Sequence, residues 1–121
     1  EKQRLALCVA LGKEADYYFL DEPTKGMDAK SKKIFGELLK EWTKMEKSIV
    51  MVSHDMEFTA KYADEISLLY QGEIIVQCPV REFMEENQFY TTGMNRVTRR
   101  VNPHIITIED VKKYAKRKNS Q

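Results

Sequence analysis

The sequence of 121 residues predicts an α/β fold with a parallel β-sheet core and flanking helices. Two short apolar runs, at residues 17–20 and 48–52, are separated by a segment with apolar residues at helical spacing. Buried parallel strands read as continuous apolar runs, because helices cover both faces of such a sheet. The alternation of strand, helix and strand therefore predicts parallel strands joined by right-handed crossovers.

The N-terminal part of the chain predicts two helices around the first strand. Residues 2–11 read as a helix that ends at Gly12, because glycine suits the left-handed position after a helix. The strand at residues 17–20 follows. Asp28 is a suitable N-cap for a helix over residues 29–45. The apolar residues of this helix share one face and predict core packing: Ile34, Phe35, Leu38, Leu39, Trp42 and Met45.

The middle of the chain predicts shorter elements. Residues 48–52 read as a second buried strand, and residues 56–63 as a short helix. Residues 66–70 and 73–77 read as two strands, which the Gln71-Gly72 pair joins in a tight turn.

The C-terminal region differs from the rest in charge. Residues 96–121 hold 8 Lys and Arg against 2 Asp and Glu, whereas the preceding residues hold 12 against 17. Residues 87–102 are polar and predict a linker, and residues 108–118 predict a short basic helix. We therefore divide the chain into residues 1–86 and a basic tail, residues 87–121. The simplest interpretation of the tail is a solvated segment, and binding to nucleic acid or an anionic membrane stays open.

Composition predicts one soluble intracellular domain. Hydrophobic residues make up 42% of the sequence, which is enough for one core. No apolar run approaches the roughly 18 residues that span a bilayer, and no segment resembles a secretory signal. Cys8 and Cys78 lack the spacing of metal ligands and predict free thiols in a reducing compartment.

Two adjacent carboxylates, Asp21 and Glu22, directly follow the first strand. The carboxyl ends of parallel strands are where open α/β sheets hold ligands. Asp21 would lie near Mg²⁺, which takes oxygen ligands, and Glu22 would orient or deprotonate an attacking water. Pro23 lacks a backbone N–H and ends the strand. Taken alone, these residues fit a simple turn equally well.

Four short motifs together resemble the C-terminal half of an ABC transporter ATP-binding domain. Residues 1–7 (EKQRLAL) resemble the end of its signature motif, and residues 17–22 (YYFLDE) its Walker B motif. Residues 26–28 (GMD) resemble the D-loop, and His54 lies where the switch histidine belongs. The resemblance covers residues 1 to about 85. It implies a partial P-loop NTPase fold, and we expect a fragment that lacks the N-terminal half with its G-x-x-x-x-G-K-[ST] phosphate loop.

The resemblance implies roles for five residues. Glu22 and His54 would be catalytic, with His54 orienting Glu22 and the attacking water. Asp21 would bind the nucleotide and hold Mg²⁺ through water. Asp28 would lie at the interface with a second ATPase domain, and Glu1 would approach the nucleotide of that domain. Without the resemblance, a lone histidine such as His54 is more often structural.

The resemblance also implies a function. The full-length protein would be an ATPase that uses ATP and Mg²⁺ and energises transport, while this chain alone would be inactive. Its partners would be a second ABC ATPase domain and transmembrane subunits at the cytoplasmic face of the cell membrane. Residues 63–74 and 79–83 resemble those of importer ATPases, and the Gly-Met-Asp sequence of residues 26–28 resembles the D-loop of the energy-coupling factor type.

Two other functions stay open at this point. One is a non-transport ABC ATPase that acts on nucleic acid or ribosomes, which the basic tail permits, although we expect no nucleic-acid partner. The other is an interaction module whose catalysis lies in another domain. The presence of both Glu22 and His54 favours an intact hydrolytic site over such a module.

Overall fold

A computed structural model describes residues 15–120. The chain forms two compact units, which divide between Asp55 and Met56, and each is described by itself. The predicted helix over residues 2–11, Gly12 and Cys8 lie outside the described residues. Among the described helices, none is long and apolar enough to cross a membrane.

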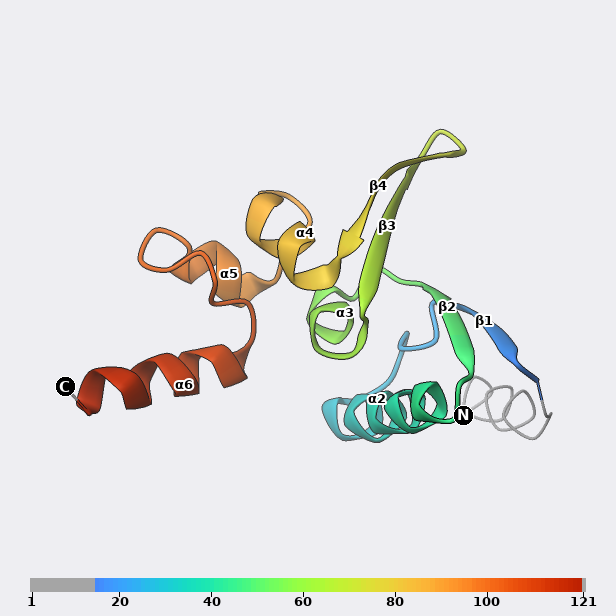
Figure 1. Ribbon diagram of the computed structural model, residues 1–121, viewed down its shortest axis with the longest axis horizontal. Helices are drawn as coiled ribbons and strands as arrows, with labels where there is room; N and C mark the ends of the chain where they lie inside the picture. Colours follow the sequence, from blue (N-terminus) through green and yellow to red (C-terminus); the bar gives the residue numbers. More distant parts are fainter. Residues whose placement is uncertain (1–14, 121) are drawn as a thin grey trace. The chain divides into compact units, whose positions relative to one another are not determined.

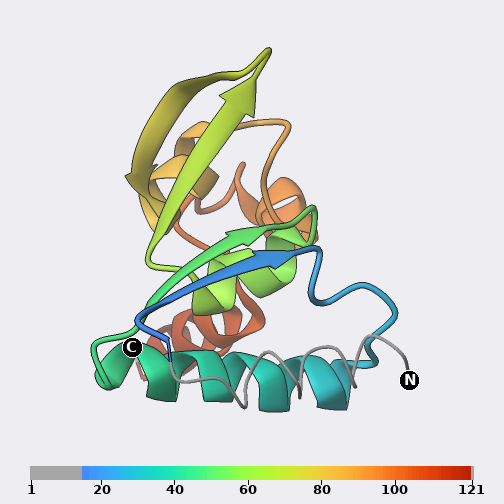
Figure 2. The same ribbon diagram turned by 90° about the vertical axis from the view of Figure 1, so that its right-hand side faces the viewer.

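The first unit contains a parallel strand pair and a long helix. Strand β1 (Tyr17–Asp21) pairs with β2 (Ser48–Val52) along its whole length. Helix α2 (Ala29–Lys44) connects them and lies along one face of the pair (Figure 2). These three elements confirm the predicted bounds to within one residue.

Helix α2 is fixed by its cap and by its apolar face. The Asp28 carboxylate accepts a hydrogen bond from Ser31 N at 2.7 Å, which satisfies one of the free N–H groups of the first turn. Phe35 and Leu39 are buried. The Tyr18 ring packs on the Trp42 ring with the centroids 4.5 Å apart. The helix therefore covers the face of β1 that carries Tyr18.

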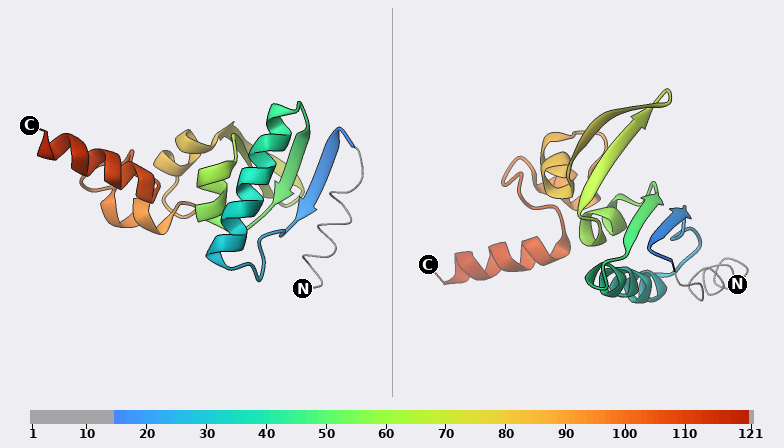
Figure 3. Two further views of the ribbon diagram at one scale, coloured as in Figure 1. Left: turned by 90° about the horizontal axis from the view of Figure 1, so that it is seen from below. Right: turned by 45° about the vertical axis from the view of Figure 1, so that its right-hand side comes forward.

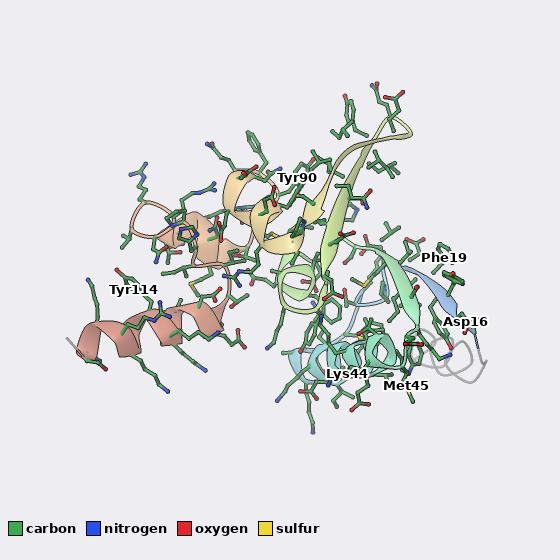
Figure 4. All side chains as sticks on the ribbon, viewed as in Figure 1. Asp16, Phe19, Lys44, Met45, Tyr90 and Tyr114 are labelled. Atoms are coloured by element: carbon green, nitrogen blue, oxygen red, sulfur yellow. The ribbon has the colours of Figure 1, made fainter. Side chains whose placement is uncertain are left out.

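The opposite face of the strand pair is exposed. Tyr17 and Phe19 are 70% and 78% exposed, and Val50 and Val52 are exposed as well. Phe19 points away from α2 in Figure 4. Within residues 15–55, α2 is the one helix that the structure describes, and the predicted helix over residues 2–11, which could cover this face, lies outside the described residues.

The second unit begins with a short helix, a hairpin and another short helix. Helix α3 (Met56–Tyr62) precedes strands β3 (Glu65–Tyr70) and β4 (Glu73–Pro79), which pair antiparallel and lead into α4 (Val80–Glu86). Figure 1 shows the hairpin extending beyond α3 and α4. The turn residues Gln71 and Gly72 have positive φ values of 50° and 85°, as two-residue hairpin turns require. The predicted tight turn is confirmed.

The core of the second unit is centred on α4 and Ile106, and partly buried apolar residues of α3 and β3 pack against it. It is formed by buried side chains, with Cys78 packed against them. The Cys78 thiol is free, as predicted. Partial burial and the nearby carboxylates of Glu82 and Glu86 raise the pKa of Cys78. The buried core residues are Val80, Phe83, Met84 and Ile106.

The segment that we predicted as a linker, residues 87–102, contains helix α5 (Gly93–Thr98). Its polar side chains are buried and hydrogen-bonded. Asn95 Nδ2 donates to the carbonyl oxygens of Pro103 and Ile105 at 2.7 and 3.0 Å. Thr92 caps α5 and donates to Ile106 O at 2.5 Å. Tertiary hydrogen bonds therefore order residues that composition alone indicates as solvated, while the predicted division between residues 86 and 87 stays a prediction.

Helix α6 (Ile108–Asn119) confirms the predicted basic helix. It begins with a capping box, in which Thr107 Oγ1 accepts from Asp110 N and the Asp110 carboxylate accepts from Thr107 N. Glu109 accepts a hydrogen bond from Lys61 of α3 at 2.9 Å. In Figure 3 the C-terminal end of α6 points away from the rest of the second unit.

Candidate functional site

The candidate site lies where β1 and β2 end side by side. The strand ladder continues one residue beyond β1, because Glu22 N donates to Val52 O at 2.8 Å. Glu22 then adopts a left-handed conformation, with φ of 44°, which is uncommon for a residue with a side chain. This conformation turns the chain out of the sheet at the position of the second carboxylate.

Two successive turns follow Glu22. Lys25 N donates to Glu22 O, and Met27 N donates to Thr24 O, both at 3.1 Å. Gly26 has a φ of 75°, and a Cβ on it would meet no atom within 4 Å. The glycine is therefore required by the backbone conformation and not by lack of space. These turns deliver the chain to Asp28 at the start of α2.

The structure brings Glu22 and His54 together across the two strands. His54 Nε2 lies 3.4 Å from Glu22 Oε1, and His54 N donates to Glu22 Oε2 at 3.4 Å. The Glu22 side chain is 30% exposed, whereas the imidazole is 95% exposed. Both distances are longer than an ordinary hydrogen bond. The carboxylate is thus held beside the end of β2, and the imidazole lies in solvent within reach of a ligand.

Asp21 is the last residue of β1 and is exposed. Mg²⁺ is usually held by one or two carboxylates together with waters and phosphates. An exposed carboxylate at a strand end fits that mode of binding. Within residues 15–120, no three His, Cys, Asp or Glu side chains are grouped so that they could hold a metal ion.

The other two predicted site residues are not part of this pair. Asp28 uses its carboxylate to cap α2, which is compatible with a second role at an interface. Glu1 lies outside the described residues. The structure therefore describes four of the five predicted site residues and brings Glu22 and His54 into contact.

Sequence reasoning missed an ion pair beside the site. Lys32 Nζ of α2 lies 2.5 Å from Asp55 Oδ2, and the two side chains are 35% and 18% exposed. Asp55 N also donates to Ser53 Oγ at 3.1 Å. These contacts fix the chain on both sides of His54. The two partners are 23 residues apart, and nothing in their spacing indicates the contact.

The arrangement can carry proton transfer at the ends of the two strands. A partly buried carboxylate can accept a proton from a water, and an imidazole 3.4 Å away can orient that carboxylate or donate to a bound anion. The exposed carboxylate of Asp21 adds an oxygen ligand next to Glu22. Such a set of groups is suited to hydrolysis of a charged substrate.

Comparisons with known proteins identify relatives of the chain. A Bacillus thuringiensis protein named an ABC transporter ATP-binding protein is 44% identical over 111 residues, which cover 92% of this chain and 20% of that protein. A Pyrococcus furiosus protein of the same name is 40% identical over 85 residues, which cover 70% of this chain and 33% of that protein. No protein-family model matches the chain.

A further relative is named an energy-coupling factor transporter ATP-binding protein and comes from Staphylococcus saprophyticus. It is 31% identical over 90 residues, which cover 74% of this chain and 31% of that protein. The chain spans between a fifth and a third of the length of these three curated relatives.

Proposed function

Because the chain belongs by sequence to the ABC transporter ATP-binding proteins, we propose that it carries the hydrolytic residues of an ATPase that energises transport. The observation that supports this proposal is the contact between Glu22 and His54 at the ends of two parallel strands. Glu22 takes the proton of the attacking water, and His54 orients Glu22 and contacts the γ-phosphate. This division of roles needs both residues at one edge of one sheet.

The proposed cofactors are ATP and Mg²⁺. Asp21 holds Mg²⁺ through water, and the ion neutralises charge on the phosphates when it is bound. Glu22 lies next to Asp21 in the chain, so the proposed base and the proposed metal ligand approach one ligand from the same strand end. Asp28 and Glu1 bind at the interface with a second ATPase domain.

The proposed partners are a second ABC ATPase domain and transmembrane transporter subunits, at the cytoplasmic face of the cell membrane. We further propose an importer of the energy-coupling factor type. The relative from Staphylococcus saprophyticus, which bears that name, supports this choice. So do residues 26–28, which carry the Gly-Met-Asp sequence.

The experiment that tests the proposal is Glu22→Gln in the full-length protein. The amide is nearly isosteric but cannot take a proton, so ATP binding should be retained while hydrolysis falls by about 100-fold or more. Glu37→Gln on the exposed side of α2 is the matched control and should hydrolyse ATP normally. Unchanged turnover in Glu22→Gln would remove Glu22 from the role of base.

A further inference from the structure

The exposed residues of helix α5 and of the turn after it recur at the spacing of one helix face. Residues 92 and 95 are buried, whereas residues 93, 96, 97, 100 and 101 are exposed. Positions three, four, seven and eight apart lie on the same side of a helix. Although α5 ends at Thr98, Asn102 N donates to Thr98 O at 2.8 Å, so the chain winds through one further turn and the exposed positions continue along it. We call Phe89, Arg96, Val97, Arg100 and Val101 the outer face of α5.

The outer face is apolar as well as basic. Val97 is 80% exposed and Val101 is 73% exposed. Phe89 is 81% exposed, and its backbone carbonyl oxygen accepts a hydrogen bond from Arg96 Nη2 at 3.0 Å, which ties its backbone to the Arg96 side chain. Single exposed apolar residues are ordinary, but an apolar cluster rimmed by charged residues marks an interaction surface.

The chain segment that begins with Arg96 is basic. Residues 96–121 hold eight Lys and Arg and two acidic residues. Both acidic residues are engaged within the unit: Glu109 with Lys61 at 2.9 Å, and Asp110 with Arg81 at 3.4 Å and with the cap of α6. The remaining basic side chains of α6 are exposed and add positive charge to the C-terminal segment: Lys112, Lys113, Lys116, Arg117 and Lys118.

We propose that the outer face of α5 binds the surface of an anionic membrane directly. Val97 and Val101 enter the boundary between headgroups and acyl chains, and Arg96 and Arg100 contact lipid phosphates. The exposed lysines of α6 supply further attraction to anionic lipid. This contact is additional to any attachment through transmembrane subunits.

The apolar residues favour a membrane over nucleic acid as the partner. Nucleic-acid surfaces combine basic residues with stacking aromatic rings or hydrogen-bonding groups that read bases. Val97 and Val101 offer neither, and a charged phosphate backbone would leave them in water. A lipid surface uses both kinds of residue, because its phosphates meet the arginines while its acyl chains cover the valines.

The test is cosedimentation of the full-length protein with vesicles that contain no other protein. Phosphatidylcholine vesicles should bind it weakly, and vesicles of phosphatidylcholine mixed with phosphatidylglycerol should bind it strongly, less so at high salt. The double variant Arg96→Glu with Arg100→Glu should bind at least about tenfold more weakly. Lys30→Glu with Lys44→Glu, two exposed lysines of α2, changes the net charge equally and should bind normally.

A second pair of measurements separates insertion from simple attraction. Val97→Ser with Val101→Ser keeps every charge and should still bind about tenfold more weakly. In the Val97→Trp variant, lipids with brominated acyl chains should quench the fluorescence of the introduced tryptophan. In the Lys30→Trp variant, the same lipids should leave the fluorescence of the introduced tryptophan unquenched. Circular dichroism establishes that each variant is folded.

Three results would overturn the proposal. One is that the folded protein fails to bind anionic vesicles. Another is that the α2 control variant weakens binding as much as the variant of the outer face, since attraction would then depend on net charge alone. The third is binding to a DNA or RNA duplex that the arginine variant abolishes and the serine variant leaves intact, which would make nucleic acid the partner.

Discussion

Lys32 and Asp55 form an ion pair between α2 and the chain just after β2, with Nζ and Oδ2 2.5 Å apart. Asp55 follows His54 directly, so the pair holds the segment that carries the imidazole. Because the Asp55 side chain is 18% exposed, its charge is poorly solvated and needs a partner. The pair is therefore a support for the candidate site.

Removal of one partner should destabilise the protein. We expect Lys32→Met to lower the free energy of unfolding by about 1 kcal/mol or more, because a largely buried carboxylate loses its charged donor. Urea unfolding measures the change. Lys33→Met is the matched control, since Lys33 contacts Glu37 at 3.8 Å with both side chains more than half exposed. Its effect should stay within about 0.5 kcal/mol, and equal losses would contradict a special role for Lys32.

Substitution of His54 should slow hydrolysis in the full-length protein. His54→Ala removes the imidazole that lies 3.4 Å from Glu22, and we expect turnover to fall by about tenfold or more. A steady-state phosphate-release assay at saturating ATP measures it. His104→Ala, which removes a histidine that contacts Glu85 in the second unit, should leave turnover unchanged. Normal turnover in His54→Ala would return His54 to a structural role.

The buried amide of Asn95 should be essential for the fold of residues 87–106. Asn95→Ala leaves the carbonyl oxygens of Pro103 and Ile105 without their donor, and the Asn95 side chain is fully buried. We expect a loss of about 2 kcal/mol in the free energy of unfolding. Asn119→Ala on exposed helix α6 is the control, with an effect below about 0.5 kcal/mol. A comparably small effect at Asn95 would show that the region is a solvated linker after all.

Asp110 should contribute stability that acid removes. Burial acts to raise its pKa, but hydrogen bonds from Thr107 and Ile106 to the carboxylate outweigh burial, and the net pKa is lowered from 3.8. A lowered folded-state pKa means that the contribution is complete above the unfolded value and is lost as the pH falls through the folded value.

The comparison of Asp110→Asn with the unsubstituted protein tests this linkage. The difference in urea midpoint should be constant from about pH 7 to about pH 5 and should shrink as the pH falls below about 4. A difference that does not vary over this range would mean that ionisation of Asp110 adds nothing to stability. The hydrogen bond from Lys61 lowers the pKa of Glu109. We therefore expect the contribution of Glu109 to stability to depend on pH with the same sign.

The pair of Glu22 and His54 could be predicted because the family resemblance selects the two residues and the topology brings them to one edge of the sheet. Two apolar runs with a helix between them predict parallel strands, and residues that follow parallel strands meet at one edge of the sheet. The bounds of β1, α2 and β2 follow from the same pattern and from Asp28 as the cap.

The remaining features depend on tertiary contacts that no local pattern encodes. Lys32 pairs with Asp55, which is 23 residues away in the sequence. Asn95 donates hydrogen bonds to the carbonyl oxygens of Pro103 and Ile105, although the polar residues around it in the sequence indicate no folded structure. Thr91 and Thr92 read as solvated because polar residues are usually exposed, whereas here both are buried and hydrogen-bonded. Composition can indicate that a segment is polar, but not that it has partners.

Glu22 has a left-handed backbone conformation, with φ of 44°. This conformation lowers the stability of the fold at the same residue whose carboxylate serves the proposed chemistry. Such a conformation costs a residue with a side chain about 1 kcal/mol, and glycine would adopt it freely. A laboratory selection for thermal resistance alone would therefore favour Glu22→Gly, whose product would lack the carboxylate that contacts His54. Engineering of a more robust protein should hold this position fixed and seek its gains elsewhere.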